Sequence, residues 1–183
     1  MKFTDGFWQL RDGVTPVYAQ EAYDVCAGDG EVTITAPGKV IERRGDTLNR
    51  PTLTVTLSSP LPEVIGVRVD HWQGVRAERG FALASQEGHV VVDAGDESAT
   101  LRAGSLAATV TRGAPWSLAF TAGEEGGERV LTSSGPKSLG YMTVEGEGAF
   151  VHEQLALGVG ELVYGLGERF GPLVKNGQTV DIW

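Results

Sequence analysis

The side chains that could perform chemistry are few and widely separated in this sequence. The histidines His71, His89 and His152 lack the short spacing of a metal site built on one element. The single cysteine, Cys26, has no activating neighbour, so we expect a small buried or half-buried hydrophobe. The serines lack the glycines of a nucleophile elbow, and no Gly-Lys-Ser/Thr phosphate loop occurs. The residues therefore indicate no catalytic group, no metal site and no cofactor site.

A dense run of glycine, aromatic and charged residues occupies 163–170, with the sequence Val-Tyr-Gly-Leu-Gly-Glu-Arg-Phe. Its Gly165 and Gly167 superficially match a dinucleotide-binding fingerprint, but Phe170 stands where the third glycine is needed. Gly171 and Pro172 then prevent the helix that would hold a pyrophosphate. We interpret these glycines as positions where a strand bulges or approaches another backbone.

Four charged or aromatic residues near this run could contribute to a carbohydrate site. Glu168 and Arg169 are adjacent, so on a strand they would point to opposite faces, which favours a structural role over one shared pocket. Asp181 and Trp183 could combine a carboxylate with an aromatic platform for a sugar ring. Trp183 could equally be a core residue at the end of a strand.

The elements that would position these residues are short alternating segments bounded by turns. Segment 52–57 alternates strictly, with threonine on the outer face of a half-buried strand, and 27–30 predicts a hairpin loop. No window of helical length shows clean 3.6-residue periodicity without Gly or Pro. The sequence therefore predicts an all-β fold, an antiparallel β-sandwich. Its expected strands are 17–25, 31–36, 52–57, 64–72, 89–93, 99–103, 106–111, 116–121, 129–131, 141–144, 150–157 and 162–166.

Length and charge limit the possible functions. The 183 residues fit one domain, 1–183, and the 26 glycines are typical of a β protein with many turns. The net charge of −9 argues against nucleic acid or an anionic membrane as a partner. No apolar stretch approaches a membrane span and no signal peptide is recognised at the N-terminus, so the cytoplasm is the expected compartment.

Several short sequence motifs, taken together, resemble those of a known family. The run 163–170, followed by Asn-Gly-Gln-Thr at 176–179 and by Trp183, resembles the N-terminal region of glycoside hydrolase family 31, and most closely its bacterial α-xylosidases. The resemblance spans nearly the whole chain and is weakest at 81–102 and 123–140. The other segments that match the family are found at 1–8, 67–74, 113–118 and 155–161.

The resemblance implies a galactose-mutarotase-like sandwich packed against a (β/α)8 barrel, with a carbohydrate as the substrate and no cofactor. In that family two barrel aspartates perform retaining hydrolysis, which places their carboxyl groups about 5–5.5 Å apart. A barrel takes about 250 residues, so the catalytic machinery is expected to be absent from this chain. No Asp-Met-Asn-Glu run, typical of the nucleophile's surroundings, is present.

The resemblance also assigns roles to residues near the C-terminus. It implies that the motif residues within 164–170 have structural roles. It also places Asp181 and Trp183 near the substrate, because a family loop that shapes the active-site mouth starts at about these positions. The motif residues are Tyr164, Gly165, Gly167, Glu168, Arg169 and Phe170. We further expect the reading frame to continue past Trp183, with an unpaired edge that self-associates or is poorly ordered.

Two other functions remain open from the residues alone. A free-standing carbohydrate-binding sandwich would need exposed, coplanar indoles among Trp8, Trp72, Trp116 and Trp183. A sugar epimerase or mutarotase would need His71 or His152 to converge with a glutamate in a pocket. A homo-oligomer is compatible with each of these functions.

Overall fold

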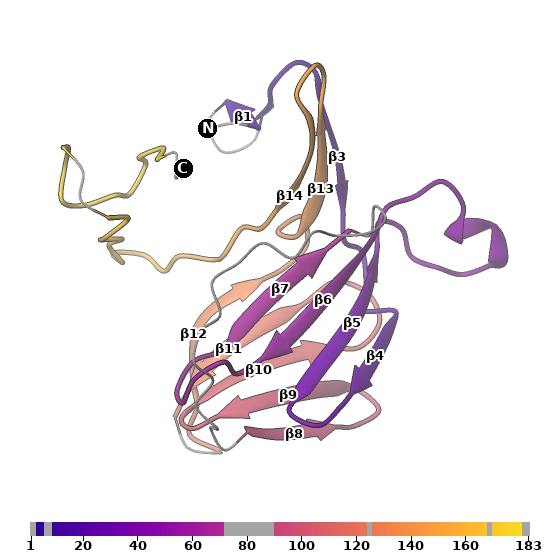
Figure 1. Cartoon of the computed structure of the whole chain (residues 1–183), viewed down its shortest axis with the longest axis vertical. Helices are drawn as coiled ribbons and strands as arrows, with labels where there is room; N and C mark the ends of the chain where they lie inside the picture. The colour runs from indigo at the N-terminus through magenta and orange to yellow at the C-terminus, as the bar shows by residue number, and fades with distance from the viewer. Residues whose placement is uncertain (1–2, 6–8, 72–89, 124–125, 168–169, 181–183) are drawn as a thin grey trace.

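The computed structural model describes residues 3–5, 9–71, 90–123, 126–167 and 170–180. Two antiparallel sheets lie face to face and form a sandwich (Figure 1). The first has the strand order β4-β5-β6-β7. Its strands are β4 (Asp24–Ala27), β5 (Glu31–Pro37), β6 (Thr52–Ser58) and β7 (Gly66–Asp70).

The alternation of β6 determines which face of the first sheet is buried. Leu53, Val55 and Leu57 are buried, whereas threonines occupy the alternate positions of the strand. The register pairs Val55 with Ile34 and Leu57 with Val32 on β5, so apolar side chains of neighbouring strands share the inner face. The outer face carries threonines and charged residues, as expected for an antiparallel sheet solvated on one side.

The second sheet has the order β12-β11-β10-β9-β8. Leu101 on β9 pairs with Ala108 on β10, and both are fully buried against the first sheet. The register of β11 and β12 shifts at Phe120 and Thr121, where the strand is irregular. The strands are β8 (Val90–Ala94), β9 (Ser98–Ala103), β10 (Leu106–Thr111), β11 (Leu118–Ala122) and β12 (Arg129–Ser134).

Smaller elements extend from one end of the sandwich (Figure 1). A three-stranded sheet has the order β14-β13-β3. Among the described residues, a two-stranded hairpin and one short 3-10 helix complete the regular structure. These elements are β3 (Val14–Tyr18), β13 (Gly140–Val144), β14 (Gly148–His152), β1 (Thr4–Asp5), β2 (Gln9–Leu10) and η1 (Arg44–Thr47).

The all-β antiparallel sandwich predicted from the sequence is confirmed, although several strand limits are wrong. Segment 17–25 is divided, because residues 19–23 cross from β3 to β4 and pair with other parts of the chain. Segment 150–157 ends as a strand at His152. Within the described residues, no helix is long and apolar enough to cross a membrane.

The strand expected at 162–166 is absent from the structure. Three consecutive residues, Gly165, Leu166 and Gly167, have φ values of 96°, 67° and 80°, in the left-handed region. An extended strand requires negative φ, so this backbone cannot continue a β-ladder. The apolar residues of 162–166 were therefore a misleading signal for a strand, and the two glycines at 165 and 167 were the stronger signal.

Candidate functional site

The residues singled out near the C-terminus belong to a segment that leaves the sandwich. We call the described residues 153–167 and 170–180 the C-terminal arm; it runs away from β14 and, beyond its first residues, projects away from both main sheets in Figure 1. Its first residues are tied to β12, where the Thr132 hydroxyl donates to Ala156 O at 2.7 Å and Ala156 N donates to Ser133 O at 2.9 Å. The arm thus has a fixed origin on the sandwich.

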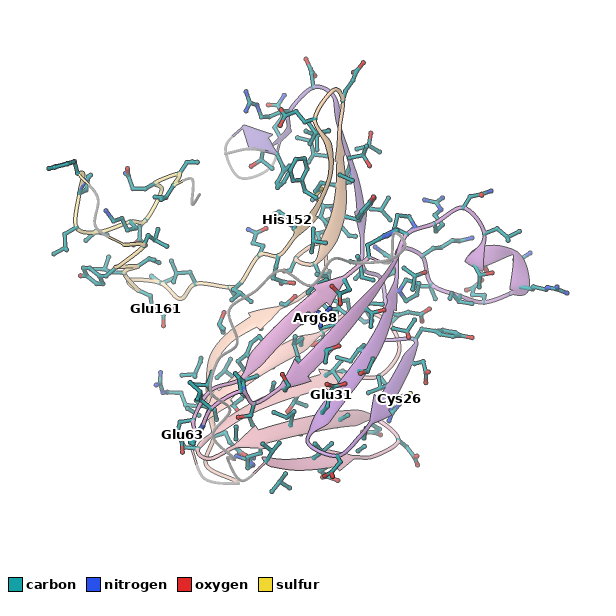
Figure 2. All side chains as sticks on the ribbon, in the orientation of Figure 1. Cys26, Glu31, Glu63, Arg68, His152 and Glu161 are labelled. Atoms are coloured by element: carbon teal, nitrogen blue, oxygen red, sulfur yellow. The ribbon has the colours of Figure 1, made fainter. Side chains whose placement is uncertain are left out.

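Further along, the arm folds back on itself through backbone and side-chain hydrogen bonds. Lys175 N donates to Val163 O at 2.7 Å, and Val163 N donates to the Asn176 side-chain oxygen Oδ1 at 2.8 Å. The Asn176 amide nitrogen Nδ2 donates to Glu161 O at 3.0 Å. Figure 2 shows Glu161 on the arm, away from the sheets. One asparagine therefore joins the two ends of a loop.

The described motif residues lie on this loop. Tyr164 is 54% exposed and Phe170 is fully exposed, while Gly165 and Gly167 supply the positive φ values given above. The other four site candidates, Glu168, Arg169, Asp181 and Trp183, lie outside the described residues. Their assignments stay predictions.

Large apolar side chains are exposed on the arm at described positions between 155 and 173. Val159 and Phe170 are fully exposed, and Leu173 is 77% exposed. An exposed apolar surface of this kind is typical of a contact with another protein surface. The further exposed members are Leu155, Leu157, Leu162, Val163, Tyr164 and Leu166. The described part of the arm is therefore an exposed apolar surface, and no cluster of acid, base and nucleophile lies on it.

The structure excludes Trp116 as an exposed sugar platform. Its side chain is 1% exposed and packs in the core between the two sheets. Its indole Nε1 donates to the Ser134 hydroxyl at 2.9 Å, so the polar atom of the ring is satisfied inside the protein. The other three tryptophans proposed as platforms, Trp8, Trp72 and Trp183, are outside the described residues.

The two described histidines occupy separate environments. His71 stacks on Tyr141, with ring centroids 4.4 Å apart. His152 lies at the base of the arm (Figure 2), with Nδ1 3.1 Å from Ser138 O and its ring edge-on to Phe3. Partial burial lowers the pKa of His152. Among the described residues, no group of three or more His, Cys, Asp and Glu could hold a metal ion.

Next to His152, the Glu153 carboxyl contacts Ser134, the residue whose hydroxyl accepts the hydrogen bond from Trp116. Glu153 is exposed as a residue, but its carboxyl is partly desolvated where it meets Ser134. This desolvation raises the pKa of Glu153, against the opposing effect of the hydrogen bond from the Ser134 hydroxyl. The arm's origin is thereby linked to the core of the sandwich.

The expectation for Cys26 was wrong, because this side chain is exposed. Val25 points into the core, so the next residue on β4 points to solvent. The Cys26 thiol lies 3.5 Å from Asp24 Oδ2, and the hydrogen bond and the negative charge of this carboxylate raise the pKa of Cys26. A raised pKa makes Cys26 a poor nucleophile at neutral pH.

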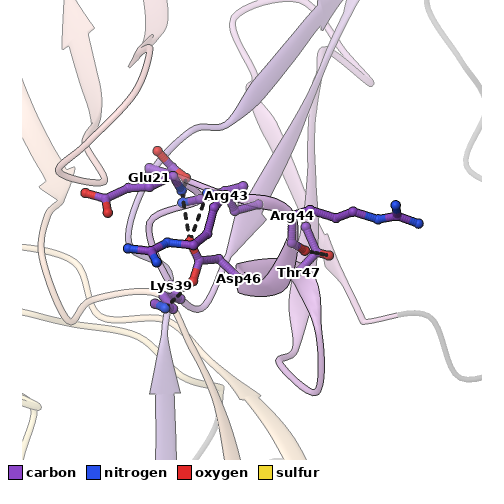
Figure 3. Close-up of polar contacts among 8 residues, drawn as sticks. Glu21, Lys39, Arg43, Arg44, Asp46 and Thr47 are labelled. Atoms are coloured by element: carbon purple, nitrogen blue, oxygen red, sulfur yellow. Dashed lines mark hydrogen bonds and ion pairs between the residues drawn. The ribbon is translucent and has the colours of Figure 1, made fainter.

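A loop between β5 and β6 was missed as an organised feature by the sequence reasoning. Glu21 is buried and accepts a hydrogen bond from Ile41 N at 2.7 Å. Asp46 is also buried, accepts from Arg43 N at 3.0 Å and pairs with Lys39 (Figure 3). The hydrogen bond from Lys39 lowers the pKa of Asp46. These contacts stabilise the loop itself and form no reactive centre.

Two facing antiparallel sheets, with a separate three-stranded extension and a projecting arm, define an antiparallel β-sandwich domain. A family profile described as the glycosyl hydrolase 31 N-terminal galactose mutarotase-like domain matches residues 54–183. The chain therefore belongs to this domain family. The resemblance noted in the sequence is confirmed.

Two curated relatives match the whole chain. The α-xylosidase XylQ of Lactiplantibacillus pentosus is 35% identical over 183 residues, which make up 24% of its length. An α-xylosidase of Emericella nidulans is 35% identical over a match that includes the whole chain and 26% of its own length. The chain thus spans about a quarter of the length of these relatives.

A solved structure supports the same fold. A crystal structure of an uncharacterized protein from Listeria monocytogenes superposes with a TM-score of 0.60. It is 19% identical and covers 88% of this chain but 14% of its own. At this identity the likeness concerns the fold alone.

Proposed function

We propose that this chain is the N-terminal, non-catalytic domain of an α-xylosidase-like retaining glycoside hydrolase acting on α-linked xylosides or glucosides. The observation that carries the proposal is the 35% identity to α-xylosidase XylQ over the whole chain, which is 24% of that enzyme. The remaining three quarters of such an enzyme would contain the two carboxylates of the retaining mechanism.

The domain's own contribution follows from its surface. The sandwich has a closed core, and its apolar arm offers a contact for the catalytic part of the same polypeptide. In the intact enzyme, Asp181 and Trp183 would lie near the carbohydrate and help to shape the active-site mouth. The buried Trp116 gives no support to the alternative of a free-standing sugar platform.

Activity on an aryl α-xyloside tests this proposal directly. The 183-residue chain should release no nitrophenol above a heat-killed control, because it lacks the nucleophile and the acid/base of the reaction. The polypeptide translated from the complete reading frame in the source genome should release it. A reading frame that ends at Trp183, or hydrolysis by the repurified 183-residue chain, would contradict the proposal.

The compartment and the assembly state are part of the same proposal. We place the enzyme in the cytoplasm, which is consistent with a single cysteine that has no partner for an internal disulfide. Cell fractionation followed by the xyloside assay would test this location. Sedimentation velocity of the full polypeptide would show whether it forms a homo-oligomer.

A further inference from the structure

Asn176 makes contacts that its exposed position would not predict. Its side chain accepts a hydrogen bond from Val163 N at 2.8 Å and donates one to Glu161 O at 3.0 Å. The oxygen and the nitrogen of the side-chain amide are thus both hydrogen-bonded, to residues that precede Asn176 by 13 and 15 positions. Lys175 N adds a backbone bond to Val163 O at 2.7 Å, beside the asparagine. These three bonds close the arm into a loop, which we name the Asn176 loop (described residues 161–167 and 170–176).

The Asn176 loop exposes apolar side chains that the sandwich does not use. Tyr164, Leu166, Phe170 and Leu173 are all exposed, from 40% for Leu166 to full exposure for Phe170. The core cluster draws its members from Ala19 to Leu139, with Tyr141 packed against it, and takes none from the described arm. The sandwich therefore closes without the loop, so its apolar surface is available to a partner.

Closing the loop before it meets a partner lowers the entropy cost of docking, because fewer backbone and side-chain conformations are lost on contact. The left-handed backbone at Gly165, Leu166 and Gly167 turns the chain within the loop. A loop held at its base by three hydrogen bonds, with aromatic and aliphatic side chains outward, has the composition of an interface centre.

We propose that Asn176 is a positioning residue that preforms this loop for docking onto the catalytic part of the same polypeptide. The inference rests on the proposed function. The occupant follows from length: the matched relatives are about four times as long as this chain, which covers 24% and 26% of them. Because the domain and the rest of the polypeptide are covalently linked, each is present to the other at a high effective concentration.

The first test concerns the loop itself and uses hydrogen exchange on the 183-residue chain. Asn176→Ala should speed exchange of the Val163 amide by about tenfold, because that N–H loses its acceptor. Asn176→Asp should give a smaller increase, since a carboxylate still accepts from Val163 N but cannot donate to Glu161 O. Gln178→Ala is the matched control, because this exposed side chain makes none of the loop's hydrogen bonds within the described residues.

Unchanged Val163 exchange in Asn176→Ala would overturn the positioning role and leave the proposed function intact. Exchange in the core strand β6 should not change in any of the three variants. An equal increase there would show a general loss of stability and would also contradict a positioning role.

The second test concerns docking and uses the polypeptide of the complete reading frame. Peptides that contain Tyr164 and Leu173 should exchange more slowly in this polypeptide than in the 183-residue chain, and Asn176→Ala should remove most of that difference. Equal exchange in the two wild-type forms would overturn docking even if the full polypeptide hydrolyses xylosides. Concentration-dependent slowing in the 183-residue chain alone would also overturn it, because the occupant would then be a second copy.

Discussion

The buried hydrogen bond between Trp116 and Ser134 allows a quantitative test of the core. Both side chains are essentially inaccessible, at 1% exposure each, and their polar atoms lie 2.9 Å apart. Trp116→Phe removes the donor and part of a large ring. The lost hydrogen bond contributes about 1 kcal/mol, and the unfilled volume adds about 1–2 kcal/mol, less than the 3–5 kcal/mol typical of truncating Phe or Trp to Ala.

The expected destabilisation of Trp116→Phe is therefore about 2–3 kcal/mol. For a chain of this size, 1 kcal/mol changes the melting temperature by about 2–4 °C, so the decrease should be about 4–12 °C. Ser134→Ala leaves the indole N–H buried without an acceptor, which costs about 1–3 kcal/mol. The double variant should cost less than the sum by about 1 kcal/mol, because it removes both partners.

The measurement is urea unfolding of the wild type and these three variants, followed by far-UV circular dichroism because the two variants with Trp116→Phe lack an indole. Ser133→Ala is the matched control, since its side chain points away from Ser134 on the same strand, and it should change stability by less than about 0.5 kcal/mol. If Trp116→Phe costs less than about 0.5 kcal/mol, or if the two substitutions are additive, Trp116 is not the hydrogen-bonded core residue described above.

Three other predictions concern contacts at the surface. Gly104→Ala should destabilise the chain, because Gly104 has a φ of 62° and an added Cβ would collide with the Glu63 carboxylate; thermal melting tests this, with Gly45→Ala, which has open space, as the control. The Ser105 hydroxyl and N–H donate to the Glu63 carboxylate and lower its pKa. The stability from this contact is therefore present above about pH 4.5, where the unfolded carboxyl is ionised, and is lost as the pH falls through the lower folded-state pKa. Glu63→Gln should weaken this pH dependence in urea unfolding measured at acid pH. Cys26 should react slowly with a thiol reagent at pH 7 because its pKa is raised, and Asp24→Asn should speed the reaction; an unchanged rate would contradict the role of Asp24.

Much of the fold was predictable because strand formation leaves a local pattern. The alternation at 52–57 predicted β6 and its buried face, and segment 106–111 matches β10. A period of two places every second side chain on one face, so burial follows once one side is apolar. The short motifs of the family also occur in the same order along this chain, which is why the domain family could be recognised without coordinates.

The tertiary structure decided what alternation cannot encode. Trp116 was one of the candidate platforms for a free-standing sugar-binding sandwich, and only the packing of two sheets showed that it is buried against Ser134. Segment 162–166 is apolar enough for a strand, yet a strand exists only with a hydrogen-bonded neighbour, and here Val163 pairs with Asn176 and Lys175 instead. Contacts between residues distant in sequence depend on how the chain folds back, so the loop at Asn176 could be found only in three dimensions.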